Sequence, residues 1–200
     1  MQVELTSVSA IRGVTPHQVL EVVERWFDDT GLAHGHRPAT AAQPGDVCIS
    51  GADGWSWVGW PAYFAPRDLA ASQVLSRELH AVVSTVATTT DEGWSHTLLG
   101  CGTVVDRFHS YPAGLAWDDG DVAALAAEWS GDHELVARVF GVPACGVRRH
   151  FCQATTATRD HPGRDRDGYL GLWYALGIRL RDATPYAVLA VDATWQRLPA

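Results

Sequence analysis

Apolar residues repeat at helical spacing in the segment 16–28, near the start of the chain. Thr15 stands at the position of a helix N-cap, Pro16 suits the first turn, and Gly31 follows the end. The pattern therefore predicts a helix over 16–28. Its apolar stripe consists of Val19, Leu20, Val22, Val23, Trp26 and Phe27.

Three runs rich in β-forming residues follow one another in the middle of the chain, with only turns between them. They cover 82–89, 94–99 and 103–109, and Gly-containing turns separate strands in this way when they form hairpins. The sequence predicts an antiparallel β-meander at about 80–110.

The remaining strands come in local groups between helices and do not alternate regularly with them. The predicted fold class is therefore α+β, with the antiparallel meander in a mixed sheet packed against several helices. We expect residues 1–200 to form a single α+β domain, in which a helical C-terminal subdomain could begin at about 118. The segment 144–167 has no pattern that selects a structure. Further helices are predicted over 65–79, 121–129, 132–140 and 169–178, and further strands over 3–10, 47–50, 54–59 and 186–195.

The charge composition excludes several kinds of chemistry. The formal net charge is −8, and all 15 basic residues are Arg. Without Lys the chain cannot be a Schiff-base enzyme, a P-loop NTPase, a protein kinase or a Ser-x-x-Lys acyl enzyme. An acidic balance also disfavours binding to nucleic acid, whose phosphates require a basic face. It favours a basic protein partner through long-range attraction.

The start of the chain, MQVELTSVSA, has neither a basic region nor an apolar core typical of a signal peptide. The apolar runs are shorter than the roughly 18 residues that span a bilayer. We therefore expect a soluble, cytoplasmic, bacterial protein that does not bind membranes. In such a compartment free thiols are expected at Cys48, Cys101, Cys145 and Cys152.

A four-residue motif occurs twice, as DGWS at 53–56 and EGWS at 92–95. It resembles part of the nucleophile elbow of hydrolases, which requires Gly two residues after the Ser. Val58 and Thr97 occupy that position here, and a β-rich run follows each copy. Both copies are therefore predicted to be turns that start a strand, with Trp as the first inward residue.

Other chemical motifs are incomplete. The run GCGTVV at 100–105 lacks the third Gly of a dinucleotide loop, and GRDRDG at 163–168 lacks the strongest calcium ligands. His34 and His36 have the spacing of two ligands on one extended segment, but no carboxylate follows at short range, and the spacing of Cys145, His150 and Cys152 matches no standard zinc knuckle. We expect no cofactor and no metal.

The register of the last two meander strands selects one polar pair. A three-residue loop at 100–102, with Gly102 in the left-handed position, gives the cleaner division between the two faces. In that register His96 lies opposite Asp106, between the pairs Trp94–Phe108 and Leu98–Val104. The carboxylate is then expected to raise the pKa of His96 and to orient the ring as a general base requires. The alternative is a satisfied pair in the core with no catalysis.

Two functions remain open. In size and acidity the chain resembles small bacterial immunity or antitoxin-type proteins, which neutralise a basic partner by binding to it, and the missing catalytic motifs favour this over catalysis. The alternative is a small-molecule-binding domain or a hydrolase-type enzyme that uses His96 and Asp106 in an aromatic pocket. The expected contact residues for a partner or ligand are Trp57, Trp60, Tyr63, Phe64, Trp94 and Phe108.

Overall fold

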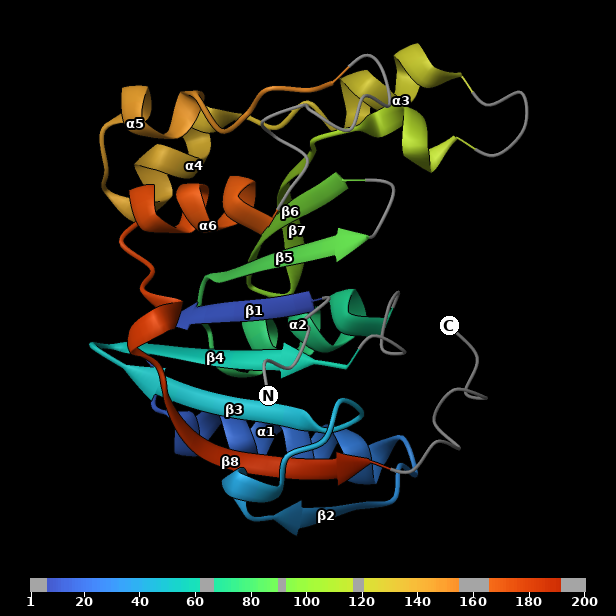
Figure 1. Cartoon of the computed structure of the whole chain (residues 1–200), viewed down its shortest axis with the longest axis vertical. Helices are drawn as coiled ribbons and strands as arrows, with labels where there is room; N and C mark the ends of the chain where they lie inside the picture. The colour runs from blue at the N-terminus through green and yellow to red at the C-terminus, as the bar shows by residue number, and fades with distance from the viewer. Residues whose placement is uncertain (1–6, 62–66, 90–92, 117–120, 155–165, 192–200) are drawn as a thin grey trace. The chain divides into compact units, whose positions relative to one another are not determined.

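The computed structural model describes residues 7–61, 67–89, 93–116, 121–154 and 166–191 (Figure 1). In this part of the chain eight strands form one antiparallel sheet in the order β2-β8-β3-β4-β1-β5-β6-β7. The strands are β1 (Ser7–Arg12), β2 (His34–Arg37), β3 (Val47–Ala52), β4 (Trp55–Trp60), β5 (Val83–Thr89), β6 (Gly93–Gly100), β7 (Thr103–His109) and β8 (Thr184–Val191). The helices are α1 (Pro16–Asp29), α2 (Arg67–Glu78), α3 (Val122–Glu128), α4 (His133–Phe140), α5 (Ala144–Arg148) and α6 (Arg166–Ala175).

The α+β class and the meander β5-β6-β7 are confirmed, and the sheet around the meander is antiparallel rather than mixed. The order of the strands explains this. Hairpins join β3 to β4 and β6 to β7, while the connection through α2 leads from β4 past β1 to β5. The helical crossover makes β4 and β5 parallel to each other, but β1 lies between them and runs in the opposite direction. Each pair of neighbouring strands is therefore antiparallel.

The chain divides into two compact units. Unit 1 takes the described residues of Met1–Thr85, Leu99–Thr103 and Leu180–Ala200, and unit 2 those of Val86–Leu98 and Val104–Arg179. In unit 1, α1 and α2 contact each other and pack on the same face of the strands (Figure 1). Unit 2 contains α3 to α6, among which α5 contacts both α4 and α6.

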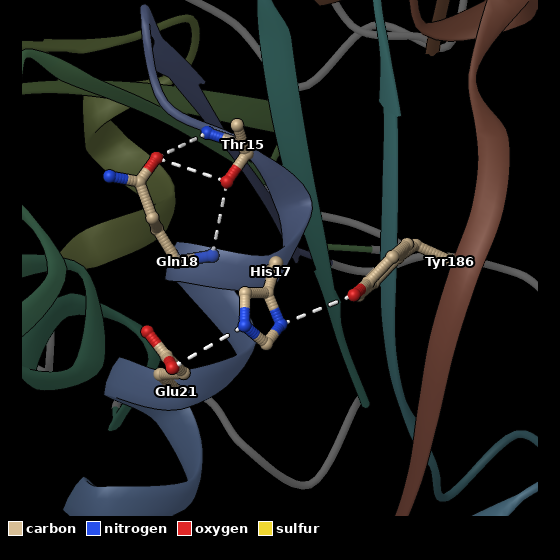
Figure 2. A network of polar contacts seen from close by, with 5 residues as sticks. All are labelled: Thr15, His17, Gln18, Glu21 and Tyr186. Carbon is tan, nitrogen blue, oxygen red and sulfur yellow. Dashed lines mark hydrogen bonds and ion pairs between the residues drawn. The ribbon is translucent and has the colours of Figure 1, made fainter.

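Helix α1 begins at the residues that the sequence predicts. Thr15 Oγ1 accepts a hydrogen bond from Gln18 N (3.3 Å), and Gln18 Oε1 accepts one from Thr15 N (2.9 Å), which together form a capping box (Figure 2). The predicted stripe is buried except for Trp26, which is half-buried. Burial of this stripe attaches α1 to the sheet of unit 1.

A network of buried hydroxyl groups fastens α2 to the sheet. Ser9 Oγ of β1 lies 2.8 Å from Ser72 Oγ of α2 and 2.9 Å from Thr85 Oγ1 of β5. Ser7 donates a hydrogen bond to Asp68, a carboxylate whose pKa is raised by burial. Buried polar groups need such partners, so the network fixes how α2 sits on the strands.

Two hairpin turns share one backbone geometry. Asp53 and Gly54 join β3 to β4 with φ of 49° and 77°, and Cys101 and Gly102 join β6 to β7 with φ of 51° and 78°. Two successive positive φ angles are typical of the two-residue type I′ turn. The prediction of a three-residue loop at 100–102 is therefore wrong.

The two copies of the Gly-Trp-Ser motif both begin a strand, as predicted, but their side chains differ. Trp94 is buried, whereas Trp55 is only half-buried. In the first copy the buried residue is Ser56, whose hydroxyl donates to the carbonyl of Val14 (2.9 Å). The expectation of an inward Trp therefore holds only for the second copy.

Candidate functional site

His96 is fully buried, and one aromatic ring packs near it. The centroid of its ring lies 6.3 Å from that of Phe151 in an edge-on arrangement. Burial lowers the pKa of His96 to about 4, so the ring is neutral at neutral pH. The expected rise in pKa is therefore wrong, because loss of solvent acts on the imidazolium more strongly than any carboxylate.

Asp106 bonds to the backbone and not to an imidazole. Its Oδ1 accepts a hydrogen bond from Asp132 N (2.8 Å), and its Oδ2 has no hydrogen-bond partner among the described residues. Burial raises the pKa of Asp106, and the charge of Asp132 adds to that rise. The prediction that Asp106 orients His96 is therefore wrong. The carboxylate instead accepts a hydrogen bond from the backbone of Asp132, the N-cap residue of α4.

The expected aromatic contact residues lie in the core where the structure describes them. Trp57 and Trp60 are each 1% exposed, and Trp94 and Phe108 are equally inaccessible. Tyr63 and Phe64 lie outside the described residues. A buried indole cannot contact a partner, so the expected aromatic surface does not exist at Trp57 and Trp60. The rings of Trp94 and Phe108 contact each other, with centroids 5.0 Å apart, although the three-residue loop from which their pairing was predicted is not present.

An exposed chain of polar contacts joins α1 to β8 in unit 1 (Figure 2). Tyr186 Oη lies 3.2 Å from His17 Nδ1, and His17 Nε2 lies 3.4 Å from Glu21 Oε1. The tyrosine ring meets the imidazole edge-on, at 6.4 Å between centroids. The side chain of Tyr186 is 50% exposed, yet both its ring and its hydroxyl are held in place. We call Tyr186, His17 and the acidic residues of α1 the α1–β8 surface.

The acidic residues of α1 extend this surface along the helix. The helix carries Glu21, Glu24, Asp28 and Asp29 against a single arginine, Arg25. Strand β2 supplies two histidines to these carboxylates: His36 Nε2 lies 2.7 Å from Glu24 Oε1, and His34 Nδ1 lies 3.9 Å from Asp28 Oδ1.

A cleft of about 580 Å³ opens on the surface of unit 2. The ring of Phe151 forms part of its wall and packs on Phe108, with centroids 4.8 Å apart. His96 therefore lies behind the aromatic wall of this cleft and not within it. The cleft is lined by His133, Cys145, Arg148, Arg149, Phe151 and Cys152.

One arginine of the cleft is held by a neighbouring histidine. Arg149 Nε donates a hydrogen bond to His150 Nε2 (3.1 Å). The His150 ring packs on Gly171 of α6, where an added Cβ would lie 2.6 Å from its Cε1 atom. Burial and the charge of Arg149 lower the pKa of His150.

Sequence reasoning missed both surfaces for physical reasons. Tyr186 and His17 are far apart in sequence, and no local pattern indicates that β8 lies beside α1. Arg148 and Arg149 fall in the segment without a clear pattern, where the structure has the short helix α5. The histidine pair His34 and His36 lies in β2, a segment for which the sequence predicts no strand. The sequence singled out Cys145 and Cys152, and the two arginines are adjacent to each other, but no spacing indicated that these residues line one cleft.

No family model matches this chain, no curated protein matches it, and no solved structure matches it. Among the described residues no three His, Cys, Asp or Glu side chains form a group that could hold a metal ion. No described helix combines the length and apolar character needed to cross a membrane. Functional inference therefore depends on the geometry of the two surfaces.

Proposed function

We propose that the protein acts by binding a basic protein partner through the α1–β8 surface, in the manner of small immunity or antitoxin-type proteins. The observation that carries this proposal is the exposed tyrosine ring of Tyr186, which is held by His17 and, through it, by Glu21. Tyrosine is enriched among the residues that dominate binding energy at protein interfaces. A ring that is already oriented loses less side-chain freedom when a partner docks.

The acidic residues beside Tyr186 support the choice of a basic partner. Glu21, Asp28 and Asp29 are exposed, so their charges reach into solvent. Together with the net charge of −8 they attract a basic protein over distances of about 10 Å at moderate salt. Charge then sets the rate of association, and the oriented tyrosine supplies a contact that slows dissociation.

Catalysis by His96 and Asp106 has no support in this arrangement. His96 is sealed behind Phe151, and Asp106 is engaged by the backbone of Asp132. A general base must reach the proton that it removes, directly or through one water molecule. A binding function is therefore preferred over the hydrolase-type alternative.

The test begins with affinity capture from host lysate, at low and high salt, and identification of the retained protein. That protein is then purified, and its Kd is measured by calorimetry against the wild type and Tyr186→Ala. We expect the variant to weaken binding by about tenfold or more, because a central aromatic contact is lost. Glu21→Gln with Asp28→Asn should mainly slow association and reduce its dependence on salt.

Tyr174→Ala is the matched control, because this tyrosine of unit 2 is 64% exposed but lies outside the α1–β8 surface. It should bind as the wild type does. Equal affinities for Tyr186→Ala and Tyr174→Ala would contradict the proposed surface. A retained partner whose binding does not respond to salt would contradict the role of charge.

A further inference from the structure

Two arginines of the unit 2 cleft pair with no carboxylate in the part of the chain that the structure describes. Some arginines of the described chain pair with acids, such as Arg37 with Asp46 and Arg107 with Glu128, each at 3.2 Å. Arg148 and Arg149 have no such partner among the described residues, and no carboxylate is among the described residues that line the cleft. In a chain of net charge −8, a cleft with this lining has the opposite charge to the molecule as a whole.

One N–H donor of the Arg149 guanidinium already makes a hydrogen bond within the protein. Its Nε is bonded to His150, which does not line the cleft, so the two terminal amino groups remain for a ligand. His150 in turn is held by its close packing on Gly171. His150 is thus a positioning residue that limits the orientations of the Arg149 guanidinium.

The rest of the lining has a different chemical character. Phe151 presents a half-buried ring, and the exposed thiols of Cys145 and Cys152 are weakly polar. A volume of about 580 Å³ is within the usual range for sites of small organic ligands. The cleft therefore offers charged donors and an aromatic wall to one small molecule.

We propose that this cleft binds a phosphate monoester that carries an aromatic group. Two guanidinium groups match the double charge of a phosphate monoester, and each can donate two parallel hydrogen bonds to its oxygens. The aromatic group packs against Phe151. This site lies in unit 2 and is independent of the α1–β8 surface in unit 1.

Calorimetric titration with phenyl phosphate, inorganic phosphate and benzoate tests the proposed chemistry. Phenyl phosphate should bind most tightly, because it alone combines the dianion with the ring. Arg148→Gln and Arg149→Gln should each weaken its binding by about tenfold. Arg138→Gln is the control, since this exposed arginine of α4 does not line the cleft.

His150→Ala tests the positioning role and should weaken phenyl phosphate binding several-fold, although His150 does not touch the cleft. Circular dichroism confirms that each variant is folded. Similar affinities of the wild type for phenyl phosphate and benzoate would overturn the choice of a phosphate. An unchanged affinity in Arg148→Gln and Arg149→Gln would overturn the site.

Thiol alkylation provides a second measurement that does not depend on the variants. Iodoacetamide modifies accessible thiols, and mass spectrometry follows each cysteine separately. Saturating phenyl phosphate should slow the modification of Cys145 and Cys152, while the exposed Cys101 of the β6–β7 turn in unit 1 reacts at its original rate. Unchanged rates at both cleft cysteines in the presence of bound phenyl phosphate would place the ligand elsewhere and overturn the proposal.

Discussion

Trp60 Nε1 donates a hydrogen bond of 2.8 Å to Ser9 Oγ inside the core of unit 1. One hydroxyl group of β1 therefore contacts the indole of β4, Ser72 of α2 and Thr85 of β5. Trp60, which the sequence suggested as a contact residue for a partner, is thus held in the core by a hydrogen bond from its indole N–H. The same bond makes Ser9 the shared partner of three elements.

Ser9→Ala should destabilise the protein by about 1–3 kcal/mol, because it leaves a buried indole N–H and two hydroxyl groups with fewer partners. Urea denaturation followed by circular dichroism measures the free energy of unfolding. Ser50→Ala, at a half-buried serine of β3, is the control and should cost well under this amount. Equal effects at the two positions would show that the shared partner adds nothing.

Thr15→Ala should lower stability by about 1 kcal/mol, because it removes the side-chain half of the capping box of α1. Thr15→Ser keeps the hydroxyl and should retain most of the stability. Thermal unfolding of the three proteins at one pH provides the measurement. If Thr15→Ser loses as much as Thr15→Ala, the hydroxyl is not the stabilising group.

The stability of the protein should decrease as the pH falls from about 6.5 towards 4. Burial lowers the pKa of His96 and of His109 to about 4 in the folded state, against an ordinary value of 6.5. Between these values the unfolded chain binds a proton at each histidine and the folded chain does not, so acid favours unfolding. The difference corresponds to about 3 kcal/mol for each fully titrated histidine.

His96→Leu isolates this effect, because Asp68 and Asp106 have raised pKa values and act in the opposite direction in the same range. The slope of unfolding free energy against pH between 4 and 6 should fall by about 1.4 kcal/mol per pH unit in the variant. A slope in His96→Leu equal to that of the wild type would mean that His96 is protonated in the folded state.

Gly131→Ala should open the cleft of unit 2. Gly131 has a φ of 67°, and an added Cβ would lie 2.5 Å from Phe151 Cε1 and 3.0 Å from Phe108 Cβ. The Phe151 ring must then move, at a cost of about 1–3 kcal/mol beyond the backbone strain. We expect a lower Tm and faster alkylation of Cys145 and Cys152.

Gly141→Ala separates strain from steric conflict, because its φ is 70° and nothing lies within 4 Å of the added Cβ. It should show only the backbone cost of about 1 kcal/mol. Similar losses of stability and similar thiol reactivity in the two variants would mean that Phe151 adjusts freely.

Local patterns predicted the elements of this fold well where one physical signal was sufficient. The capped amphipathic helix at 16–28 and the meander at about 80–110 needed only periodicity, a cap and turn residues. Strand β2 was missed because HGHR is short and has no apolar alternation. Helix α5 was missed because its five residues carry almost no helical signal.

The candidate site could not be predicted in the same way, because it depends on distances between remote parts of the chain. The hairpin at Cys101–Gly102 shows how sensitive such reasoning is: polar and apolar alternation favoured three residues in the turn, whereas the backbone adopts two with positive φ. Burial also lowers the pKa of His96, and no sequence pattern indicates how deeply a single side chain is buried. Composition alone pointed to a charged surface without giving its place.

The position of β8 has a consequence for how the molecule is made on the ribosome. This strand lies between β2 and β3, pairing with both, although all of unit 2 from Val104 to Arg179 is synthesised before it. Until Thr184–Val191 emerges, β2 and β3 have no strand to join them, and Tyr186 is not yet present to meet His17. The nascent chain therefore has to keep an open sheet edge soluble while later residues are added. The α1–β8 surface is then among the last features of unit 1 to form. Any binding through this surface therefore requires a chain in which β8 has already paired with β2 and β3.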